Sequence, residues 1–353
     1  MKIAIDLTSL YGRKKTGVEL YAIDLYRALL ATNHIIVPIV HVKNEIDNNP
    51  HTYTIKSSPR LWLENYKLSQ AIKNINADIA FFPVFPPPVD CYFGNTKIVP
   101  TLHDFAFLKF RNTINFAAKF YLTPKMLWAF RKADAIITIS ETVLHELKLH
   151  TKVPVFNCGE NISKDYVTAK DKVNLTNLEK WGLKENGYII SVSTIEPRKN
   201  FKYLIKVVKP VLEKTNRKLV LVGRKGWGHD NELKGLIEDL GERLVFTDYV
   251  SNECLFSLYR YAYAFALLSL DEGFGRTPFE AVACGCKRVI LSDIPIFRET
   301  FGNEGLFLPL HNENEAAQKL LYNQISLISE GFSIPFDILE QRIKLVIAKI
   351  ASL

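Results

Sequence analysis

The sequence predicts an α/β fold with two lobes, each built on a doubly wound parallel sheet. Short Val- and Ile-rich runs recur along the chain without the polar alternation of half-exposed strands, a pattern typical of strands buried on both faces. Helical patterns lie between most of these runs, and strand–helix alternation with right-handed crossovers produces doubly wound sheets. The length of 353 residues suits two domains.

The predicted strands fall into two sets of about five. The first set is Lys2–Leu7, Ile35–Val42, Asp78–Phe85, Lys97–Leu102 and Ala135–Ile139, and the second is Tyr188–Val192, Lys218–Val222, Leu244–Tyr249, Ala264–Leu270 and Arg288–Leu291. Between the sets, Asn157–Asn177 is polar and lacks a clear period, so we place the linker there. We expect an N-terminal lobe over residues 1–165 and a C-terminal lobe over 166–336, and a helix around 337–353 could pack back on the first lobe.

Charge and cysteine content narrow the class of protein. The net charge of +8 favours an anionic partner, which could be nucleic acid, an anionic membrane surface or a phosphorylated substrate. The five cysteines are an odd number in a long chain, which argues against a disulfide scaffold. The segment Met1–Asp6 predicts a first strand and not a signal peptide, and the uncharged stretch Tyr261–Leu270 is far shorter than the ~20 residues that span a bilayer. We expect a cytoplasmic protein, which could rest on the inner face of the plasma membrane.

In parallel α/β sheets, ligands bind beyond the carboxyl ends of the strands, so the residues after each strand matter most. In the first lobe, Gly17 opens a helix whose free N–H groups could bind a diphosphate, although an ordinary basic surface loop fits the segment Ser9–Glu19 equally. His103 follows the strand Lys97–Leu102, where it could donate a hydrogen bond or act as an acid or base. A satisfied structural histidine is the alternative.

In the second lobe, the strand Tyr188–Val192 runs into a segment that contains Arg198 and Lys199. Arginine offers phosphate a planar fork and lysine a point charge, which a diphosphate leaving group needs when no metal is present. A solvated basic helix start is the alternative. The glycine-rich segment Val222–Gly228 is a weak signal, because it lacks the spacing of a dinucleotide site, and the chain has no Walker loop.

The strongest constellation is Ser269–Ala281, which follows a long apolar strand. Gly273 and Gly275 would let the backbone approach a ligand closely. Free N–H groups of Arg276 and Thr277, at the start of the next helix, could then meet a phosphate.

Two carboxylates flank this glycine turn, and packing alone hardly explains them. Glu280 sits one turn into the predicted helix, where it could accept hydrogen bonds from ribose hydroxyls. Glu272 precedes the turn and could reach the sugar of the same ligand.

These motifs resemble the large retaining glycosyltransferase family 4, whose GT-B fold has two Rossmann-like lobes facing a central cleft. Glu272 and Glu280 match the family's E-x7-E motif, here EGFGRTPFE followed by AVACG. The stretch STIEPRKN looks like the donor-phosphate segment, and VGRKGWG, THDF and ADAIITIS also fall in the family's order. The resemblance covers nearly the whole chain.

The resemblance implies an enzyme that moves a sugar from a nucleotide-diphosphate donor (GDP-mannose, dTDP-rhamnose or a UDP-sugar) to a saccharide or lipid-linked saccharide acceptor. A bacterial O-antigen or capsule pathway is the expected setting. By this resemblance, Arg198 and Lys199 would bind the diphosphate, and Glu280 would bind the ribose. Glu272 would bind the sugar together with the backbone of Phe274 and Gly275, and the main chain around Val250 would contact the base. From the other lobe, Gly17 would pack against the diphosphate, and His103 would contact the sugar near the reacting centre. No cofactor or divalent metal is expected, in agreement with the absence of Asp-x-Asp.

Other interpretations remain at this point. A GT-B relative with different chemistry, such as a phosphorylase or a sugar-nucleotide epimerase, shares these features. A nucleic-acid binder is disfavoured because Glu272 and Glu280 would repel phosphates, and an NAD oxidoreductase because the dinucleotide fingerprint is missing. The basic, aromatic stretch Thr96–Lys132 could lie on anionic lipid, or it could form a core face with a solvated basic side.

Overall fold

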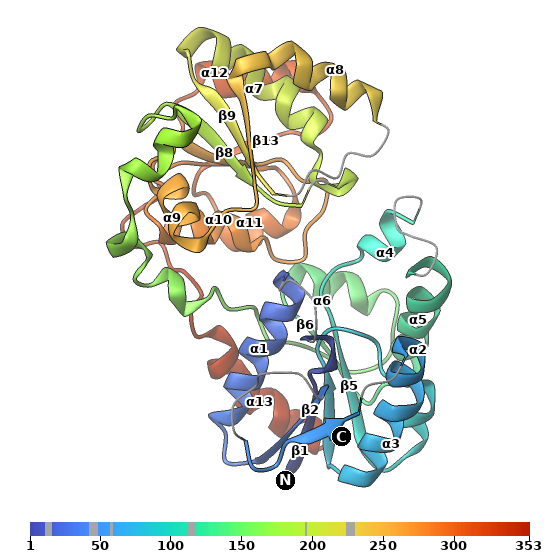
Figure 1. Cartoon of the computed structure of the whole chain (residues 1–353). Coiled ribbons are helices and arrows are strands. Elements are labelled where there is room, and N and C mark those ends of the chain that lie inside the picture. Colours follow the sequence, from blue (N-terminus) through green and yellow to red (C-terminus); the bar gives the residue numbers. More distant parts are fainter. Residues whose placement is uncertain (11–15, 42–48, 57–58, 112–117, 195, 224–229) are drawn as a thin grey trace. The chain divides into compact units, whose positions relative to one another are not determined.

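The computed structural model describes residues 1–10, 16–41, 49–56, 59–111, 118–194, 196–223 and 230–353. The chain forms two compact units, which are described separately below (Figure 1). Unit 1 comprises Met1–Asn161 and Pro335–Leu353, and unit 2 comprises Ile162–Ile334. The chain therefore leaves unit 1 once and returns to it for its last segment.

Unit 1 is built on a parallel sheet with the strand order β3-β2-β1-β4-β5-β6-β7. The strands are β1 Lys2–Asp6, β2 Ile35–His41, β3 Tyr53–Ile55, β4 Ile79–Phe82, β5 Lys97–Leu102, β6 Ile136–Thr138 and β7 Val155–Asn157. The central strands are buried along most of their length, as their apolar runs require. The sheet is wider than the five predicted strands, because β3 and β7 extend its two edges.

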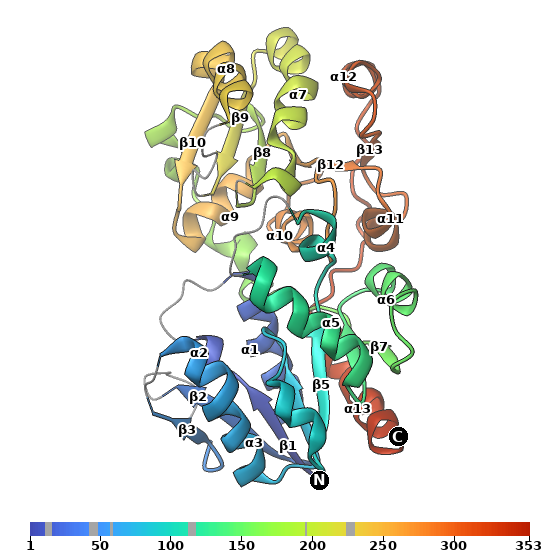
Figure 2. The same cartoon turned by 90° about the vertical axis from the view of Figure 1, so that its right-hand side faces the viewer.

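Helices cover both faces of this sheet. They are α1 Gly17–Leu30, α2 Arg60–Trp62, α3 Leu68–Ile75, α4 Ala106–Lys109, α5 Thr123–Lys132, α6 Glu141–Lys148 and α13 Ile338–Ala351. Helices α1 and α13 lie together on one face, and α3 and α5 lie on the other (Figures 1 and 2). The Lys97 ammonium donates to the carbonyls of Ile350 at 2.9 Å and Ala351 at 3.0 Å, and so satisfies the open end of α13.

Two helical segments of unit 1 contain π-helical turns. The turn Leu63–Lys67 separates α2 from α3. The turn Ala118–Leu122 directly precedes α5. A hydrogen bond from the Asn65 amide to the Tyr121 hydroxyl joins the two turns.

Unit 2 is built on a second parallel sheet, with the strand order β10-β9-β8-β11-β12-β13. The strands are β8 Tyr188–Val192, β9 Lys218–Val222, β10 Leu244–Asp248, β11 Ala264–Leu267, β12 Val289–Ser292 and β13 Leu306–Leu308. The edge strand β13 was not predicted, and β11 ends at Leu267, before the predicted Leu270. The strand order reverses between β8 and β11, which makes their carboxyl ends the topological switch point.

The helices of unit 2 are α7 Phe201–Thr215, α8 Asn231–Leu240, α9 Asn252–Arg260, α10 Arg276–Ala283, α11 Pro295–Phe301 and α12 Glu313–Tyr322. Helices α7, α8 and α12 cover one face of the sheet, and α9, α10 and α11 lie on the other (Figure 1). The expected linker contains 3-10 turns, among them Lys164–Tyr166, which pack within unit 2.

All five cysteines are buried free thiols. Within the described ranges, no helix combines the length and the apolar content needed to cross a membrane.

Candidate active site

The candidate site lies at the carboxyl ends of β8 and β11, the two neighbouring strands at the switch point of unit 2. The segment after β8 contains Arg198 and Lys199 in a short 3-10 turn, and the segment after β11 leads to Glu272. The backbone N–H of Leu270 donates to the carbonyl of Arg198 at 2.8 Å. Parallel pairing therefore brings together two segments that are far apart in the sequence.

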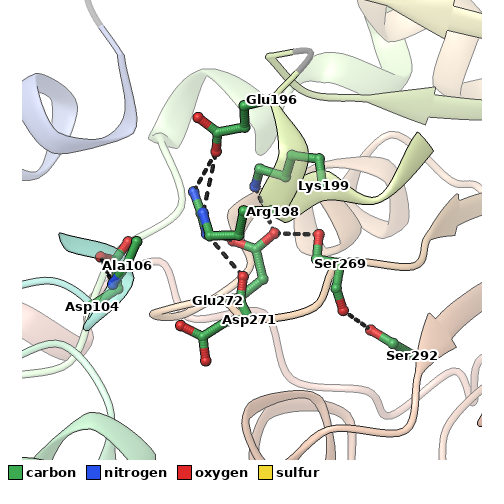
Figure 3. Close-up of polar contacts among 9 residues, drawn as sticks. All are labelled: Asp104, Ala106, Glu196, Arg198, Lys199, Ser269, Asp271, Glu272 and Ser292. Carbon is green, nitrogen blue, oxygen red and sulfur yellow. Dashed lines mark hydrogen bonds and ion pairs between the residues drawn. The ribbon is translucent and has the colours of Figure 1, made fainter. Parts of the chain in front are cut away.

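The Glu272 carboxylate joins these two segments. Its Oε2 accepts from Arg198 Nη1 at 2.9 Å, and its Oε1 accepts from Lys199 Nζ at 2.5 Å (Figure 3). Ser269 Oγ donates to the same Oε1 at 2.7 Å. The hydroxyl of Ser292, at the end of β12, donates to the Ser269 carbonyl at 2.7 Å and so ties this cluster to the next strand.

The Arg198 guanidinium is held by further acceptors. Its Nη1 donates to the Asp271 carbonyl at 2.9 Å, and its Nε and Nη2 donate to Glu196 Oε1 at 3.2 Å and 2.8 Å. The Glu196 side chain is 39% exposed, whereas that of Glu272 is 6% exposed. Two cationic side chains thus face two carboxylates, of which that of Glu196 is partly exposed and that of Glu272 is buried.

The protonation of Glu272 follows from this geometry. Burial alone would raise the pKa of the carboxyl, but the charges of Lys199 and Arg198, with hydrogen bonds from Lys199 and Ser269, outweigh burial and hold its pKa below the ordinary value. Glu272 is therefore ionised at neutral pH.

The glycine turn depends on backbone conformations and close contacts that only glycine allows. Gly275 has φ 82° and precedes α10, and a Cβ atom at this position would lie 2.6 Å from Cε1 of the buried Phe297 ring. The Phe274 ring stacks on Phe279 with centroids 5.4 Å apart. Helix α10 then begins at Arg276, and Thr277 lies in its first turn. The turn sets where this helix starts.

Glu280 lies one turn into α10 and is 8% exposed. Arg276 Nε is 3.8 Å from its Oε1, and the Tyr259 hydroxyl donates to its Oε2 at 3.4 Å. Its carboxylate is therefore held by groups of α9 and α10.

The ends of β9 and β10 complete this edge of unit 2. Gly223 follows β9, and a Cβ atom there would lie 2.1 Å from the Ser193 carbonyl oxygen. Its N–H donates to the Asp248 carbonyl at 3.2 Å. Val250 is buried two residues beyond β10. The expected glycine-rich segment continues into residues 224–228, which lie outside the described residues.

Two predicted site residues belong to unit 1. Gly17 is the first residue of α1, where the Glu19 carboxylate accepts the Thr16 N–H at 3.0 Å and already places an acid at the helix start. His103 Nε2 lies 2.7 Å from the Pro83 carbonyl, so this nitrogen carries the proton, and its ring packs edge-on against Tyr21. The basic residues 13–15 lie outside the described residues.

The stretch 96–132 does not present one continuous basic and aromatic face in its described part. Lys97 closes α13, Lys109 pairs with Glu146 at 2.7 Å, and Lys125 is buried and donates to Asn65 at 3.1 Å. Phe105 and Phe130 are core residues, whereas Phe120 is 61% exposed. The described residues contain no group of three or more His, Cys, Asp or Glu side chains arranged to hold a metal ion.

Several polar residues of the site were not assigned roles from the sequence. Ser269, Ser292 and Glu196 hold the Glu272 and Arg198 side chains in place. Their only sequence signal is adjacency to a strand end, which Ser269 and Ser292 share with many structural residues.

Two parallel-sheet lobes of this kind define a protein of the GT-B fold. The structure of Anabaena Alr3699/HepE in complex with UDP and glucose is similar, with a TM-score of 0.67 and 15% identity over 99% of this chain and 100% of that one. Residues 175–323 match the family Glycosyl transferases group 1.

Relatives of known class also match in sequence. The O-antigen chain mannosyltransferase RfbU of Salmonella typhimurium is 30% identical over 228 residues, which is 61% of this chain and 62% of that protein. The O-antigen chain mannosyltransferase B of Escherichia coli is 30% identical over 194 residues, 53% of this chain and 50% of that protein. The matches thus span half to less than two thirds of these relatives.

Proposed function

We propose that this protein is a retaining glycosyltransferase that moves a sugar from a nucleotide-diphosphate donor to a saccharide or lipid-linked saccharide acceptor in the synthesis of a bacterial surface polysaccharide. The observation that carries the proposal is the placement of Arg198 and Lys199 against the segment Ser269–Glu280 at the switch point of unit 2. The O-antigen mannosyltransferase relatives support mannose as the transferred sugar, and GDP-mannose is the first donor to test.

In this mechanism the donor loses a nucleoside diphosphate, and the sugar passes through an oxocarbenium-like transition state. Arg198 and Lys199 neutralise the charge that develops on the leaving diphosphate, and the first turn of α10 adds the positive end of its dipole. Glu272 holds hydroxyls of the sugar. Because Glu272 now binds both cations, donor binding exchanges part of these contacts for contacts with phosphate and sugar.

The other predicted residues bind the rest of the donor. Glu280 accepts the ribose hydroxyls, the main chain around Val250 meets the base, and the backbone of Phe274 and Gly275 meets the sugar. The proposed roles of Gly17 and His103 of unit 1 are to bind the diphosphate and the sugar. Since His103 Nε2 already donates to Pro83, Nδ1 is the ring nitrogen left to contact a sugar hydroxyl.

A nucleotide panel tests the donor assignment. A ligand that binds only the native state raises the unfolding temperature by mass action, so GDP, UDP and dTDP are compared by thermal shift. We expect GDP to give the largest shift and GDP-mannose to support transfer in the presence of EDTA, because the proposed chemistry uses no metal. Failure of all three diphosphates to bind would overturn the proposal.

A contact with the inner face of an anionic membrane fits a lipid-linked acceptor. Leu61, Trp62 and Phe120 of unit 1 are 62%, 53% and 61% exposed. The hydrogen bond from Asn65 to Tyr121 brings the two π-helical turns next to one another, and Lys119 Nζ lies 5.9 Å from the centre of the Phe120 ring. Aromatic and apolar side chains flanked by lysines bind the interface of anionic bilayers.

Vesicle sedimentation tests this contact. We expect binding to vesicles that contain anionic lipid at low salt, and we expect the double variant W62S/F120S to lose it. Leu149→Ser, which removes an apolar side chain that is 83% exposed elsewhere on unit 1, is the matched control and should bind normally. Equal binding by both variants would contradict the assigned surface.

A further inference from the structure

Two tyrosine hydroxyls reach the Glu280 carboxylate from different elements of unit 2. Tyr259 of α9 is fully buried, and its hydroxyl donates to Glu280 Oε2 at 3.4 Å. Tyr166 belongs to the 3-10 turn Lys164–Tyr166 and lies near enough to the same carboxylate for the charge of Glu280 to raise the pKa of its hydroxyl. On the other oxygen, Arg276 Nε lies 3.8 Å from Oε1. Glu280 is therefore surrounded by oriented partners, although it lies on a short helix.

Both tyrosine rings are fixed by aromatic neighbours. The Tyr166 ring packs edge-on against Phe256 with centroids 5.1 Å apart, and the Tyr259 ring packs against Phe265 with centroids 5.9 Å apart. Such contacts hold the rings independently of the hydroxyls. A change from Tyr to Phe thus removes the hydroxyl and leaves the packing.

The two hydroxyls keep their protons at neutral pH. Burial raises the pKa of Tyr259 well above its ordinary value, and the negative charge of Glu280 raises it further. The same two causes, in the same order, raise the pKa of Tyr166. Neither hydroxyl competes with Glu280 for a proton.

We propose that Tyr166 and Tyr259 are positioning residues that hold the Glu280 carboxylate in the orientation that accepts the ribose hydroxyls of the donor. The inference rests on the proposed function, in which Glu280 binds ribose. A carboxylate has about four acceptor sites, so Glu280 can accept from ribose hydroxyls in addition to the Tyr259 hydroxyl. Fixing the side chain in advance removes the entropy that a mobile glutamate would lose on binding.

A cycle of ligand and protein changes tests the proposal. The affinities of GDP and 2′,3′-dideoxy-GDP are measured by calorimetry for the unchanged protein, Tyr166→Phe, Tyr259→Phe and Glu280→Gln, with the uridine pair used if UDP gives the larger thermal shift. The unchanged protein should prefer GDP by about 10- to 100-fold, because hydrogen bonds to a charged group are strong. Each tyrosine variant should weaken GDP several-fold and leave the dideoxy ligand unchanged.

Tyr203→Phe is the matched control. Its hydroxyl bonds to the carbonyls of Pro309 and Asn312, away from the site, so its removal should leave the preference for GDP as it is. If the tyrosine variants weaken both ligands equally, the tyrosines are merely structural and the inference is wrong. If the unchanged protein does not distinguish the two ligands, the ribose role of Glu280 fails instead, and the inference falls with it.

Discussion

Lys199 Nζ lies 2.5 Å from Glu272 Oε1, so the ammonium group that we assign to the donor diphosphate is already paired with a buried carboxylate. The two residues lie in the segments that follow the neighbouring parallel strands β8 and β11. The Glu272 carboxylate balances the charge of the Lys199 ammonium group, which would otherwise be costly to keep away from water at the switch point. Donor binding then becomes an exchange of acceptors around fixed cations.

Arg198→Ala and Lys199→Ala should each lower turnover by about 100-fold or more, since a single electrostatic contact to the developing charge contributes about 2 to 4 kcal/mol. The matched control is Lys202→Ala, which removes a lysine one turn further along that pairs with Asp230 and Glu232. It should keep normal turnover. Steady-state kinetics with the donor chosen by the nucleotide panel provide the measurement, and normal rates in both site variants would exclude their assigned role.

Glu196→Gln should bind nucleoside diphosphate more tightly, by about 2- to 5-fold at low salt. Glu196 competes with phosphate for Arg198, and a partly exposed ion pair of this kind is worth less than about 1 kcal/mol. Titration calorimetry with GDP at two salt concentrations measures the effect, which should shrink as salt rises. Weaker binding would mean that Glu196 mainly orients the guanidinium.

Removing the charge of Glu272 should have a pH-dependent effect on stability. Because its pKa is lowered in the folded state, Glu272 contributes stability that is complete above its unfolded pKa and is lost as pH falls through the folded value. Glu272→Gln should therefore be less stable at pH 7, by up to about 3 kcal/mol, and approach the unchanged protein in acid. Urea unfolding from pH 7 to pH 3 follows the difference, and a constant difference would contradict it.

The contribution of Asp6 to stability should change with pH in the direction opposite to that of Glu272. Burial raises its pKa to about 6, although Oδ1 accepts hydrogen bonds from Thr8 N at 3.0 Å and Thr8 Oγ1 at 2.7 Å. The stability it contributes is complete below its unfolded pKa and is lost as pH rises through the folded value. Asp6→Asn should thus gain about 2 to 3 kcal/mol relative to the unchanged protein between pH 4 and pH 7. A comparison of unfolding midpoints at these pH values would show no gain if the carboxyl titrates normally.

Gly275→Ala should destabilise the protein by about 2 to 4 kcal/mol, because a left-handed residue gains a Cβ that meets the Phe297 ring at 2.6 Å. Gly235→Ala is the control with the opposite sign. Gly235 lies inside α8 with nothing within 4 Å of a Cβ, so alanine should stabilise by about 0.5 to 1 kcal/mol. Calorimetric unfolding separates the two variants, and equal effects would contradict the account of the turn.

The central strands and the five-residue edge strand β10 could be predicted from sequence, and the three-residue edge strands could not. The strands β3, β7 and β13 are each three residues long and lie at sheet edges. Three residues are too few to show an apolar run or an alternation, so these strands leave no clear pattern in the sequence. The π-helical turn Leu63–Lys67 was invisible for a similar reason, because its apolar spacing resembles that of an ordinary helix.

In the candidate site, too, some features could be predicted from the sequence and others could not. The rule that ligands bind at carboxyl ends predicts that Arg198 and Glu272 lie at one edge of a sheet, and the structure brings them together. The direct pairing of Lys199 with Glu272 was not predicted, because it depends on side-chain orientation across two loops. Tyr166 was missed because it lies in a polar segment without a period, which indicated a linker and not a support for α10.

The return of the chain to unit 1 has a consequence for biosynthesis. Helix α13 packs on α1 with Ile343 and Ile350 fully buried, and Lys97 bonds to its last carbonyls. Domains made of one continuous segment can fold while the ribosome is still working. Unit 1 cannot finish folding until residues up to 351 have emerged from the ribosome, and until then the face of α1 that packs on α13 lacks this cover.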